Sequence, residues 1–448
     1  MDTLPLPPRP NLAQYKKRAK ELVLAANSSD STAVRAWAVQ WLESLIKLLG
    51  VAVTPFAQSS FDRAVDEIEQ RIRQHRARKH GSGQITLADT QFFLANAHGF
   101  ANWSAFSNHI EWTPTSALGR EFEAAAEAVV SGDLATLERL VRANPTLIHA
   151  HSDRTHRATL LHYVAANGVE DFRQKTPTNA VAVAALLFEA GAEVDALADT
   201  YGGGRAQTTL TLLVSSTHPA EAGLQSPLVE TLVDHGAVIN GLDDDGTPLM
   251  TALGFGYGGA AETLARRGAR VDNVISAAAL GRTDLIPQLV AEGSGVDRSR
   301  VGWRWLRLPN EPAAYNALAL VWAAEFGRIA AVELLLDLGV PVGSKDTDDM
   351  TALHHAAAHR HIDVVKLLLR RGAPLEVRNT WGGTVLDSTV YFAVNQPIAH
   401  PAPTPGNSYP SIIETLIGAG ADVHQVELPT GEAEIDEILA RHARSGEG

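Results

Sequence analysis

A glycine followed by alanine or, once, by valine recurs through most of this chain and closes leucine-rich segments such as LLFEAGAEV. This dipeptide begins at Gly191, Gly236, Gly268, Gly339, Gly372 and Gly420. The intervals are 45, 32, 71, 33 and 48 residues; 71 is close to two periods, and two other intervals carry insertions. The basic unit is therefore about 33 residues long, which predicts a stack of repeated units, each in contact with its neighbours.

Each unit contains two segments with different side chains. A small-residue segment (HYVAAN, SAAALG, VWAAEF or HHAAAH) precedes a turn, and a leucine-rich segment such as AAVELLLDLGV follows it. Both are predicted to be helices: alanines allow close approach between neighbours, leucines fill the layer between units, and glycine permits a left-handed C-cap. Eight units are expected to begin near Leu118, Thr155, Asp199, Asp245, Asn273, Tyr315, Asp348 and Thr380.

The start of several units carries a longer motif. T-P-L-H-x-A-A appears as TLLHYVA (159–165), TPLMTAL (247–253) and TALHHAA (351–357). On these residues the chain resembles the ankyrin-repeat family. The resemblance implies an all-α fold, an ankyrin-repeat solenoid of about eight helix pairs at residues 116–428. A capping helix, EIDEILARHAR, is expected within residues 429–448.

Residues 1–115 have a different pattern. PNLAQYKKRAKELVLAA, TAVRAWAVQWLESLIKLL and SFDRAVDEIEQRIRQ space their apolar residues at three and four, which predicts amphipathic helices. Combined with HGFANWSAF, this region looks like the N-terminal helical region of certain bacterial ankyrin-repeat proteins. We expect an N-terminal helical domain at residues 1–115, docked on the first repeat so that it covers an apolar face there.

The charge is unevenly distributed. Residues 1–80 carry 13 Lys and Arg against 8 Asp and Glu, whereas the remaining residues carry 25 against 43. An acidic body repels phosphate, which argues against nucleic acid as the main partner. Acidic stretches at Asp243–Asp245 and Asp346–Asp349 favour a basic partner. The basic run at residues 71–80 is interpreted as a solvated helix end; the alternative is a docking arm for nucleic acid or an acidic partner.

The chain has no cysteine, no apolar N-terminal signal and no apolar run of membrane-spanning length. Disulfides, thiolate catalysis and Cys-ligated zinc are therefore excluded, and we expect a cytoplasmic protein without a membrane segment. Walker A, H-E-x-x-H and G-x-S-x-G motifs are also absent from the sequence. GFGYGG (254–259) matches G-x-G-x-x-G, but it falls at the end of a predicted helix, so we expect no dinucleotide site and no cofactor.

Four histidines lie between His354 and His361. The resemblance assigns His354 and His361 to packing and to hydrogen bonds with backbone. His355 and His359 are one helical turn apart and can in principle share a metal ion. No third ligand stands at a useful spacing, so we expect no metal site.

The resemblance places the residues just before each inter-helix turn on the concave face, where a protein or peptide partner is expected to bind. From the fourth repeat onward these positions are mainly apolar or aromatic. Further aromatics stand in the fingers, which are the segments that lead from the second helix of one repeat to the first helix of the next. The candidate binding residues are Tyr201, Phe255, Trp303, Trp305, Phe326, His359, Trp381, Tyr391 and Phe392. Aromatic side chains offer large contact area at small entropic cost, but packing of the same rings under a loop is an equal alternative.

Insertions at residues 170–179, 217–226 and 395–409 are predicted between the two helices of their repeats. The first two lie in neighbouring repeats and raise a second hypothesis, an enzyme or small-molecule-binding protein with a polar pocket at residues 160–220. Its candidate residues are His162, Asn167, Arg173, Ser216 and His218. The non-enzymatic binding scaffold remains the main prediction.

Overall fold

The computed structural model describes most of the chain. The residues outside the description are 1–3, 5, 8–9, 50–54, 78–83, 111–115, 201–205, 294–295, 297–311, 396–405, 427 and 446–448. The described residues form helices and two isolated antiparallel bridges, Ala198 with Gln207 and Lys345 with Thr351. None of the described helices is both long and apolar enough to cross a membrane.

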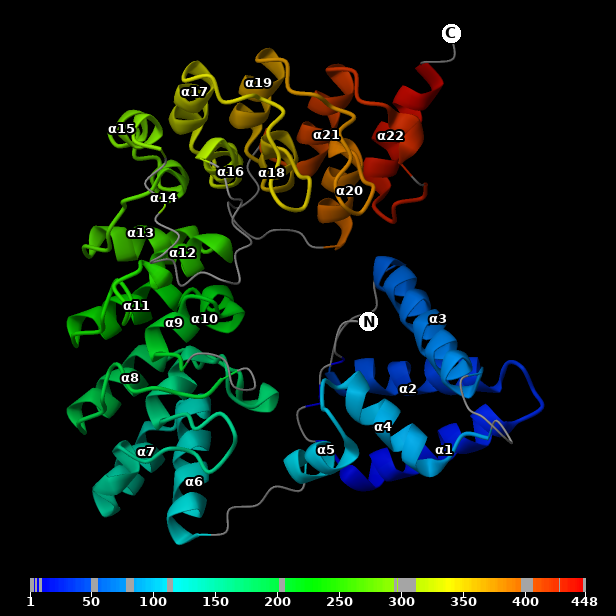
Figure 1. Ribbon diagram of the computed structural model, residues 1–448, viewed down its shortest axis with the longest axis vertical. Coiled ribbons are helices and arrows are strands. Elements are labelled where there is room, and N and C mark those ends of the chain that lie inside the picture. The colour runs from blue at the N-terminus through cyan, green and yellow to red at the C-terminus, as the bar shows by residue number, and fades with distance from the viewer. Residues whose placement is uncertain are drawn as a thin grey trace.

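Eight helix pairs stack into a curved array (Figure 1). The inner helices are α6 (Ala117–Ser131), η2 (Leu160–Ala165), α9 (Thr209–Leu213), α12 (Thr247–Gly254), α14 (Val274–Ala279), α16 (Pro312–Glu325), α18 (Ala352–Ala358) and α20 (Val385–Asn395). The outer helices are α7 (Leu134–Ala143), α8 (Ala180–Glu189), α11 (Gln225–Asp234), α13 (Gly258–Arg266), α15 (Ile286–Ala291), α17 (Ile329–Asp337), α19 (Ile362–Arg370) and α21 (Tyr409–Gly418). Successive inner helices pack against each other along the whole array. The predicted all-α ankyrin-type solenoid is thereby confirmed.

Short helices decorate this framework, and a longer one closes it. The short ones are η1 (Pro145–Ile148), η3 (Asp171–Arg173), α10 (Thr217–Glu221) and η4 (Val423–Gln425). α22 (Ala433–Ser445) packs on α21 and buries Ile435, Ile438 and Leu439 against the last repeat. In the second repeat the small-residue segment forms a 3-10 helix. Its backbone enters the left-handed region at Ala166 (φ 50°), which ends the helix one residue after Ala165.

Glycines define the end of seven outer helices. Gly191, Gly236, Gly268, Gly293, Gly339, Gly372 and Gly420 all have φ between 79° and 104°. No atom lies within 4 Å of the place that a Cβ would take at any of them, so the left-handed backbone, and not the available space, requires glycine. Gly293 also explains the 71-residue interval in the sequence, because it ends the fifth repeat inside that interval.

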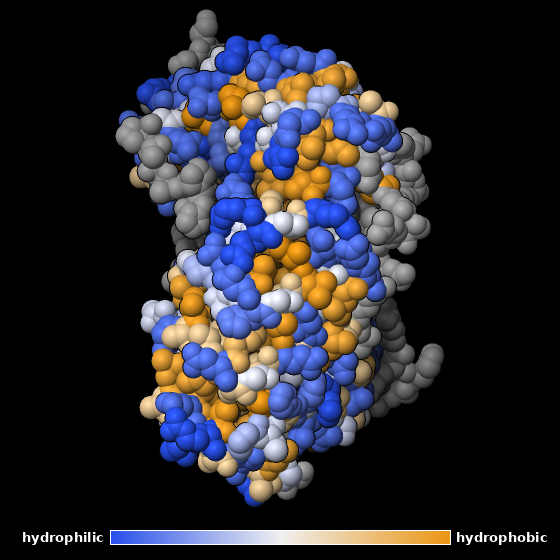
Figure 2. Space-filling model, turned by 90° about the vertical axis from the view of Figure 1, so that its left-hand side faces the viewer, coloured by the Kyte–Doolittle hydropathy of each residue, from blue (hydrophilic) through white to orange (hydrophobic). Residues whose placement is uncertain are grey.

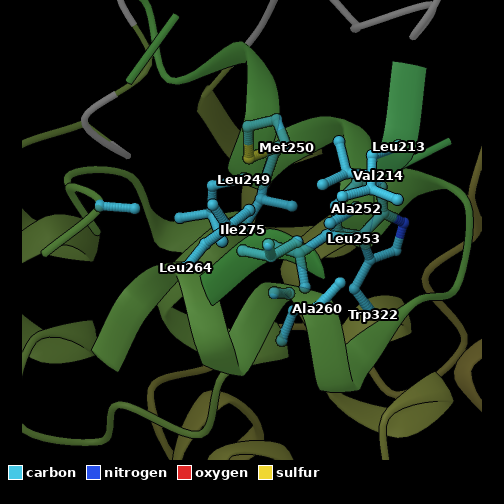
Figure 3. Packing of buried hydrophobic residues seen from close by; sticks show 14 of the residues in the cluster. Leu213, Val214, Leu249, Met250, Ala252, Leu253, Ala260, Leu264, Ile275 and Trp322 are labelled. Carbon is cyan, nitrogen blue, oxygen red and sulfur yellow. The ribbon is translucent and has the colours of Figure 1, made fainter. Parts of the chain in front are cut away.

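One continuous apolar core runs through the array. Alanines such as Ala277 and Ala323 are fully buried on the inner helices, while Leu264 and Leu335 fill the layers under the outer helices. Figure 3 shows this packing around α12, whose Leu249, Met250 and Leu253 lie among side chains from adjacent helices. The alanine-then-leucine pattern of the sequence therefore corresponds to a thin inner layer and a thick outer layer.

A polar side chain from the start of an outer element repeatedly bonds to the preceding repeat. In each case it donates to a carbonyl near the end of that repeat's inner helix. These bonds are Asn179 Nδ2 to Gly132 O (2.9 Å), Ser216 Oγ to Ala166 O (3.2 Å), Arg328 Nε to Ala279 O (2.9 Å), His361 Nε2 to Glu325 O (2.8 Å) and Tyr409 Oη to Ala358 O (2.8 Å). They satisfy carbonyls that a helix end leaves unpaired and fix the register between repeats.

Ion pairs also join neighbouring outer helices. Arg266 bonds to Glu230 at 2.6 Å, and Arg371 bonds to Asp337 at 2.7 Å. Figure 2 shows the side of the array where α8, α11 and α13 lie, with hydrophilic residues interrupting the apolar ones. These exposed pairs contribute little stability each, typically about 0–1 kcal/mol.

Before the array, five helices surround a separate apolar core: α1 (Leu12–Asn27), α2 (Ala33–Leu49), α3 (Pro55–Ala77), α4 (Leu87–Ala97) and α5 (Trp103–Ile110). Trp37, Trp41 and Leu94 are buried there, which accounts for the three-and-four spacing in the sequence. Asn11 caps α1 through Ala13 N and Gln14 N, and Thr86 with Asp89 forms a capping box at α4.

The expected docking of these helices on the first repeat is corrected by their position. Their strongest packing with the array joins α3 to α20 of the last repeat, and they lie on the inner side of the curve (Figure 1). Arg120 and Glu121 are exposed on α6, so part of the outer surface of the first repeat is polar and meets water without such a cover. The curvature of the array brings its last repeat back toward the N-terminal helices.

Candidate functional site

The inner face of the array carries three large aromatic side chains that solvent reaches. Phe255, at the C-cap of α12, is 51% exposed, and Tyr391 on α20 is 38% exposed. Trp381, in the finger before α20, is 72% exposed. These exposures are measured with the N-terminal helices in place, so those helices leave the three side chains accessible.

Three neighbouring candidates are more enclosed. Phe326 is half-buried, and its ring lies over Gly258, where a Cβ would come within 3.1 Å of the ring. Phe392 is half-buried, with its ring 5.7 Å from that of Tyr391 in an edge-on arrangement. His359 is half-buried at the C-cap of α18. Phe326 therefore stabilises the contact between repeats four and six in addition to lining the face.

The finger that presents Trp381 is held by its own side chains. Asn379 Oδ1 accepts from the backbone N–H groups of Trp381 and Gly383, both at 3.0 Å. Asn379 Nδ2 donates to Ser388 Oγ at 3.0 Å, which ties the finger to α20. The indole thus stands on a fixed turn. Three other candidates, Tyr201, Trp303 and Trp305, lie outside the described residues.

The four histidines of repeat seven have separate roles. Thr351 N–H donates to His354 Nδ1 at 3.1 Å in a capping box that starts α18, and His361 donates to the preceding repeat. Burial lowers the pKa of His354 to about 4, so its imidazole is neutral at pH 7. His354 and His361 thus have the structural roles that the family resemblance implies.

The other two histidines, His355 and His359, lie beside His361 and two carboxylates. We name this group the histidine cluster: Glu325, Asp346, His355, His359 and His361. His355 Nε2 lies 2.8 Å from Asp346 Oδ2, and its Nδ1 lies 3.5 Å from Glu325 Oε2. His359 Nδ1 donates to His355 O at 3.0 Å. The cluster joins the end of α16, a finger and α18, so it spans the junction between repeats six and seven.

The two carboxylates determine the charge of this cluster. Burial alone would lower the pKa of His355, but the bond to Asp346 and the charge of Glu325 outweigh it and raise that pKa. Burial raises the pKa of Glu325 and, with the nearby charge of His355, lowers the pKa of His359 to about 3. Among the described residues, no three His, Asp or Glu side chains are arranged to hold a metal ion. His355 and His359 instead serve hydrogen bonding.

The acidic fingers use part of their charge internally. Asp244 pairs with Arg270 at 2.6 Å, and Asp349 pairs with Lys345 at 3.3 Å. Asp346 Oδ1 accepts from the backbone N–H groups of Asp348 and Met350, both at 2.9 Å. Several of these aspartates therefore shape the turns, and fewer free charges face a partner than the sequence suggests.

Three of the five residues predicted to line a polar pocket form hydrogen bonds within or between repeats. Buried His162 accepts at Nδ1 from Thr159 N–H (3.1 Å), and burial lowers its pKa to about 4. Asn167 Nδ2 donates to Ser215 Oγ at 2.9 Å, and Ser216 donates to a backbone carbonyl of the previous repeat. His218 is exposed on α10. These contacts give the enzyme alternative no support.

Arg173, the fifth candidate, belongs to a group of charged side chains that the sequence did not indicate, all of them largely buried except Glu127. We name it the ion cluster: Glu123, Glu127, Arg154, Glu170 and Arg173. Arg173 Nη1 lies 2.7 Å from Glu123 Oε2 and 3.4 Å from Glu170 Oε1, and Arg154 pairs with both of these carboxylates. Two partners of Arg173, Glu127 and Glu123, stand 46 and 50 positions earlier in the chain, on α6. Residues so far apart leave no pattern in the sequence that would predict their contact.

Comparison with known proteins identifies the repeats. A family model described as ankyrin repeats (3 copies) matches residues 274–379, which extend from α14 past α19. Ankyrin repeat domain-containing protein 49 of Bos taurus is 44% identical over 55 residues, which are 12% of this chain and 23% of that protein. Ankyrin repeats generally mediate protein–protein interaction.

Two further proteins are similar to part of this chain. Serine/threonine-protein kinase 12 of Arabidopsis thaliana is 37% identical over 77 residues, which are 17% of each chain. The liver isoform of mitochondrial glutaminase of Rattus norvegicus is 41% identical over 75 residues, 16% of this chain and 12% of that protein. The chain thus spans less than a fifth of these two relatives. Residues 274–379 are ankyrin repeats, and the curved array that contains them is an ankyrin-repeat solenoid.

Proposed function

We propose that this protein is a non-enzymatic scaffold that binds a protein or peptide along the inner face from α12 to α20 and over the finger before α20. One observation carries this proposal: the aromatic side chains of Phe255, Trp381 and Tyr391 remain 51%, 72% and 38% exposed with the N-terminal helices in place. Exposed aromatics on a rigid surface are typical anchors of protein interfaces.

The array suits this role because its helix pairs are already ordered. Binding then spends little free energy on arranging the surface, and the affinity comes from covering the aromatic anchors. A basic partner is favoured by the charge of the chain beyond residue 80, which carries 25 Lys and Arg against 43 Asp and Glu. Such charge speeds encounter more than it strengthens the final complex.

The test starts from a partner that is recovered by cross-linking in the source cells, identified by mass spectrometry and purified. Phe255→Ala and Trp381→Ala should each weaken its binding about tenfold or more in calorimetry, as truncation of an interface anchor does. Leu338→Ala is the matched control, because Leu338 is 41% exposed at the end of outer helix α17. Equal affinity of both aromatic variants and the control would contradict the proposal.

A further inference from the structure

A second surface lies on the N-terminal helices, apart from the inner face. A cleft of ≈ 430 Å³ opens between α1 and α2. This volume falls within the range of about 300–1,000 Å³ that is typical of small-molecule sites. The exposed aromatics of the array contribute nothing to its walls, so the function proposed above does not explain it.

The walls of the cleft have an excess of positive charge. Lys17 and Arg18 project from α1, and Lys47 from α2, against a single carboxylate, Glu21. Glu21 lies 3.3 Å from Arg18 Nη1 and 3.7 Å from Lys17 Nζ, so it offsets one of the three cations. Two positive charges remain at the mouth of a partly enclosed space, which favours an anion there.

Arg18 has a fixed position over this space. Its guanidinium donates to Ser44 Oγ at 2.8 Å and to Gln40 Oε1 at 3.2 Å, so it joins α1 to α2 across the cleft. The Trp37 indole N–H donates to Arg18 O at 3.2 Å and adds a second bond between the helices. Arg18 therefore fixes the spacing of α1 and α2 before any ligand arrives, so the walls that carry Lys17 and Lys47 need little rearrangement on binding.

The floor of the cleft is apolar. Trp41 and Leu45 are buried beneath it, and Leu48 at its edge is 52% exposed. An apolar ligand body placed over Leu48 would remove that side chain from water, at about 25 cal/mol per Å² of area covered. Cations at the mouth and apolar side chains below fit a molecule with an anionic head and an apolar body.

We propose that the α1–α2 cleft binds an amphipathic organic anion, with a carboxylate or phosphate head near Lys17 and Lys47 and an apolar chain over Trp41, Leu45 and Leu48. The inference is independent of the partner bound by the array. The same chemistry occurs in free fatty acids and alkyl phosphates and in the surface of an anionic bilayer. The free molecule, rather than a bilayer, is the ligand of this cleft.

The test measures decanoate binding to the full-length protein by calorimetry at low salt. Lys47→Glu and Leu48→Ser should each weaken binding at least tenfold. Lys20→Glu and Leu24→Ser are matched controls, because both residues are exposed on α1 and neither lines the cleft. These controls should bind decanoate like the unaltered protein, and decyltrimethylammonium should not bind. Circular dichroism confirms that each variant is folded.

Three outcomes would overturn the inference: no binding of decanoate, equal loss in the cleft variants and their controls, or equal binding of the cationic surfactant. A second arm measures co-sedimentation with phosphatidylcholine vesicles containing phosphatidylglycerol. Lys47-dependent vesicle binding without decanoate binding would also overturn it, in favour of a membrane surface. Phe255→Ala should leave decanoate binding unchanged, which separates this site from the inner face.

Discussion

Two polar clusters join neighbouring repeats, and they use different chemistry. The ion cluster between the first and second repeats consists of Arg and Glu side chains, and Glu170 is only 1% exposed there. The histidine cluster between the sixth and seventh repeats consists of imidazoles and carboxylates that are 12–21% exposed. The histidine cluster lies where inner helix α16 ends, whereas the ion cluster joins the interior of α6 to the insertion after η2. The comparison shows that a junction between repeats can be held by Arg–Glu ion pairs or by imidazoles that bond to carboxylates and carbonyls.

The insertion in the second repeat explains the difference. Residues 170–179 fold back so that Arg173 reaches α6 and stacks near the Tyr163 ring at 5.8 Å. The seventh repeat has no such insertion, and His361 occupies the junction directly. The insertion in the second repeat thus supplies Arg173 to a buried ion network. The seventh repeat, which lacks one, uses histidine and carboxylate side chains at its junction.

The largest expected effect comes from breaking the ion cluster. Arg173→Met retains the aliphatic stem but leaves two buried carboxylates, Glu123 and Glu170, to share the single guanidinium of Arg154. We expect a loss of about 3–5 kcal/mol in the free energy of unfolding, measured by urea denaturation. Arg142→Met, which breaks the exposed pair with Glu138, should cost no more than about 0.5 kcal/mol. Similar losses of unfolding free energy in both variants would show that the buried ion cluster stabilises the fold no more than an exposed ion pair does.

An intermediate effect is expected at the turn beneath His361. Gly327 has φ 66°, and a Cβ there would lie 2.6 Å from His361 Nδ1. Gly327→Ala should therefore destabilise the array by about 2–4 kcal/mol, combining left-handed strain with a steric clash. Gly372→Ala (φ 79°) meets no atom within 4 Å and should cost only about 1–2 kcal/mol. Thermal unfolding of the two variants, side by side, checks this order; the reverse order would contradict the packing of His361.

The smallest effect concerns pH. Because the folded pKa of His355 is raised above 6.5, its contribution is present below pH 6.5 and is lost as the pH rises through the folded value. His354 and His162, with pKa lowered to about 4, act in the opposite direction: stability falls as the pH drops from 6.5 toward 4. Unfolding free energy should therefore be greatest near pH 6.5.

The alkaline side of this profile tests His355 specifically. His355→Gln should remove a pH-dependent loss of about 1 kcal/mol between pH 6 and pH 9, the value of a partly exposed charged hydrogen bond. Asp346→Asn should reduce the slope, because it removes one of the two carboxylate charges that raise the pKa of His355 and leaves Glu325 in place. Urea denaturation across this range gives the slopes. An unchanged slope in both variants would refute the titratable role of this junction.

Much of the architecture was predictable because it depends on local rules. The glycine after each outer helix, the alanine and leucine segments and the Thr351–His354 cap each involve residues only a few positions apart. The structural roles of His354 and His361 were also predictable from the repeat. The binding surface was predictable only as a set of positions. Exposure of Phe255 and enclosure of Phe326 depend on what the neighbouring repeat places beside them, such as Gly258.

The sequence by itself determined the repeat length, the helix pairs and the left-handed turns, because a 33-residue period repeats the same local contacts. Only the tertiary structure decided which charges meet. Arg173 finds Glu123 across 50 residues, and the curvature of the array brings α20 to α3 of the N-terminal helices. Such contacts depend on the accumulated geometry of the repeats and on insertions between them, which no local pattern of residues records.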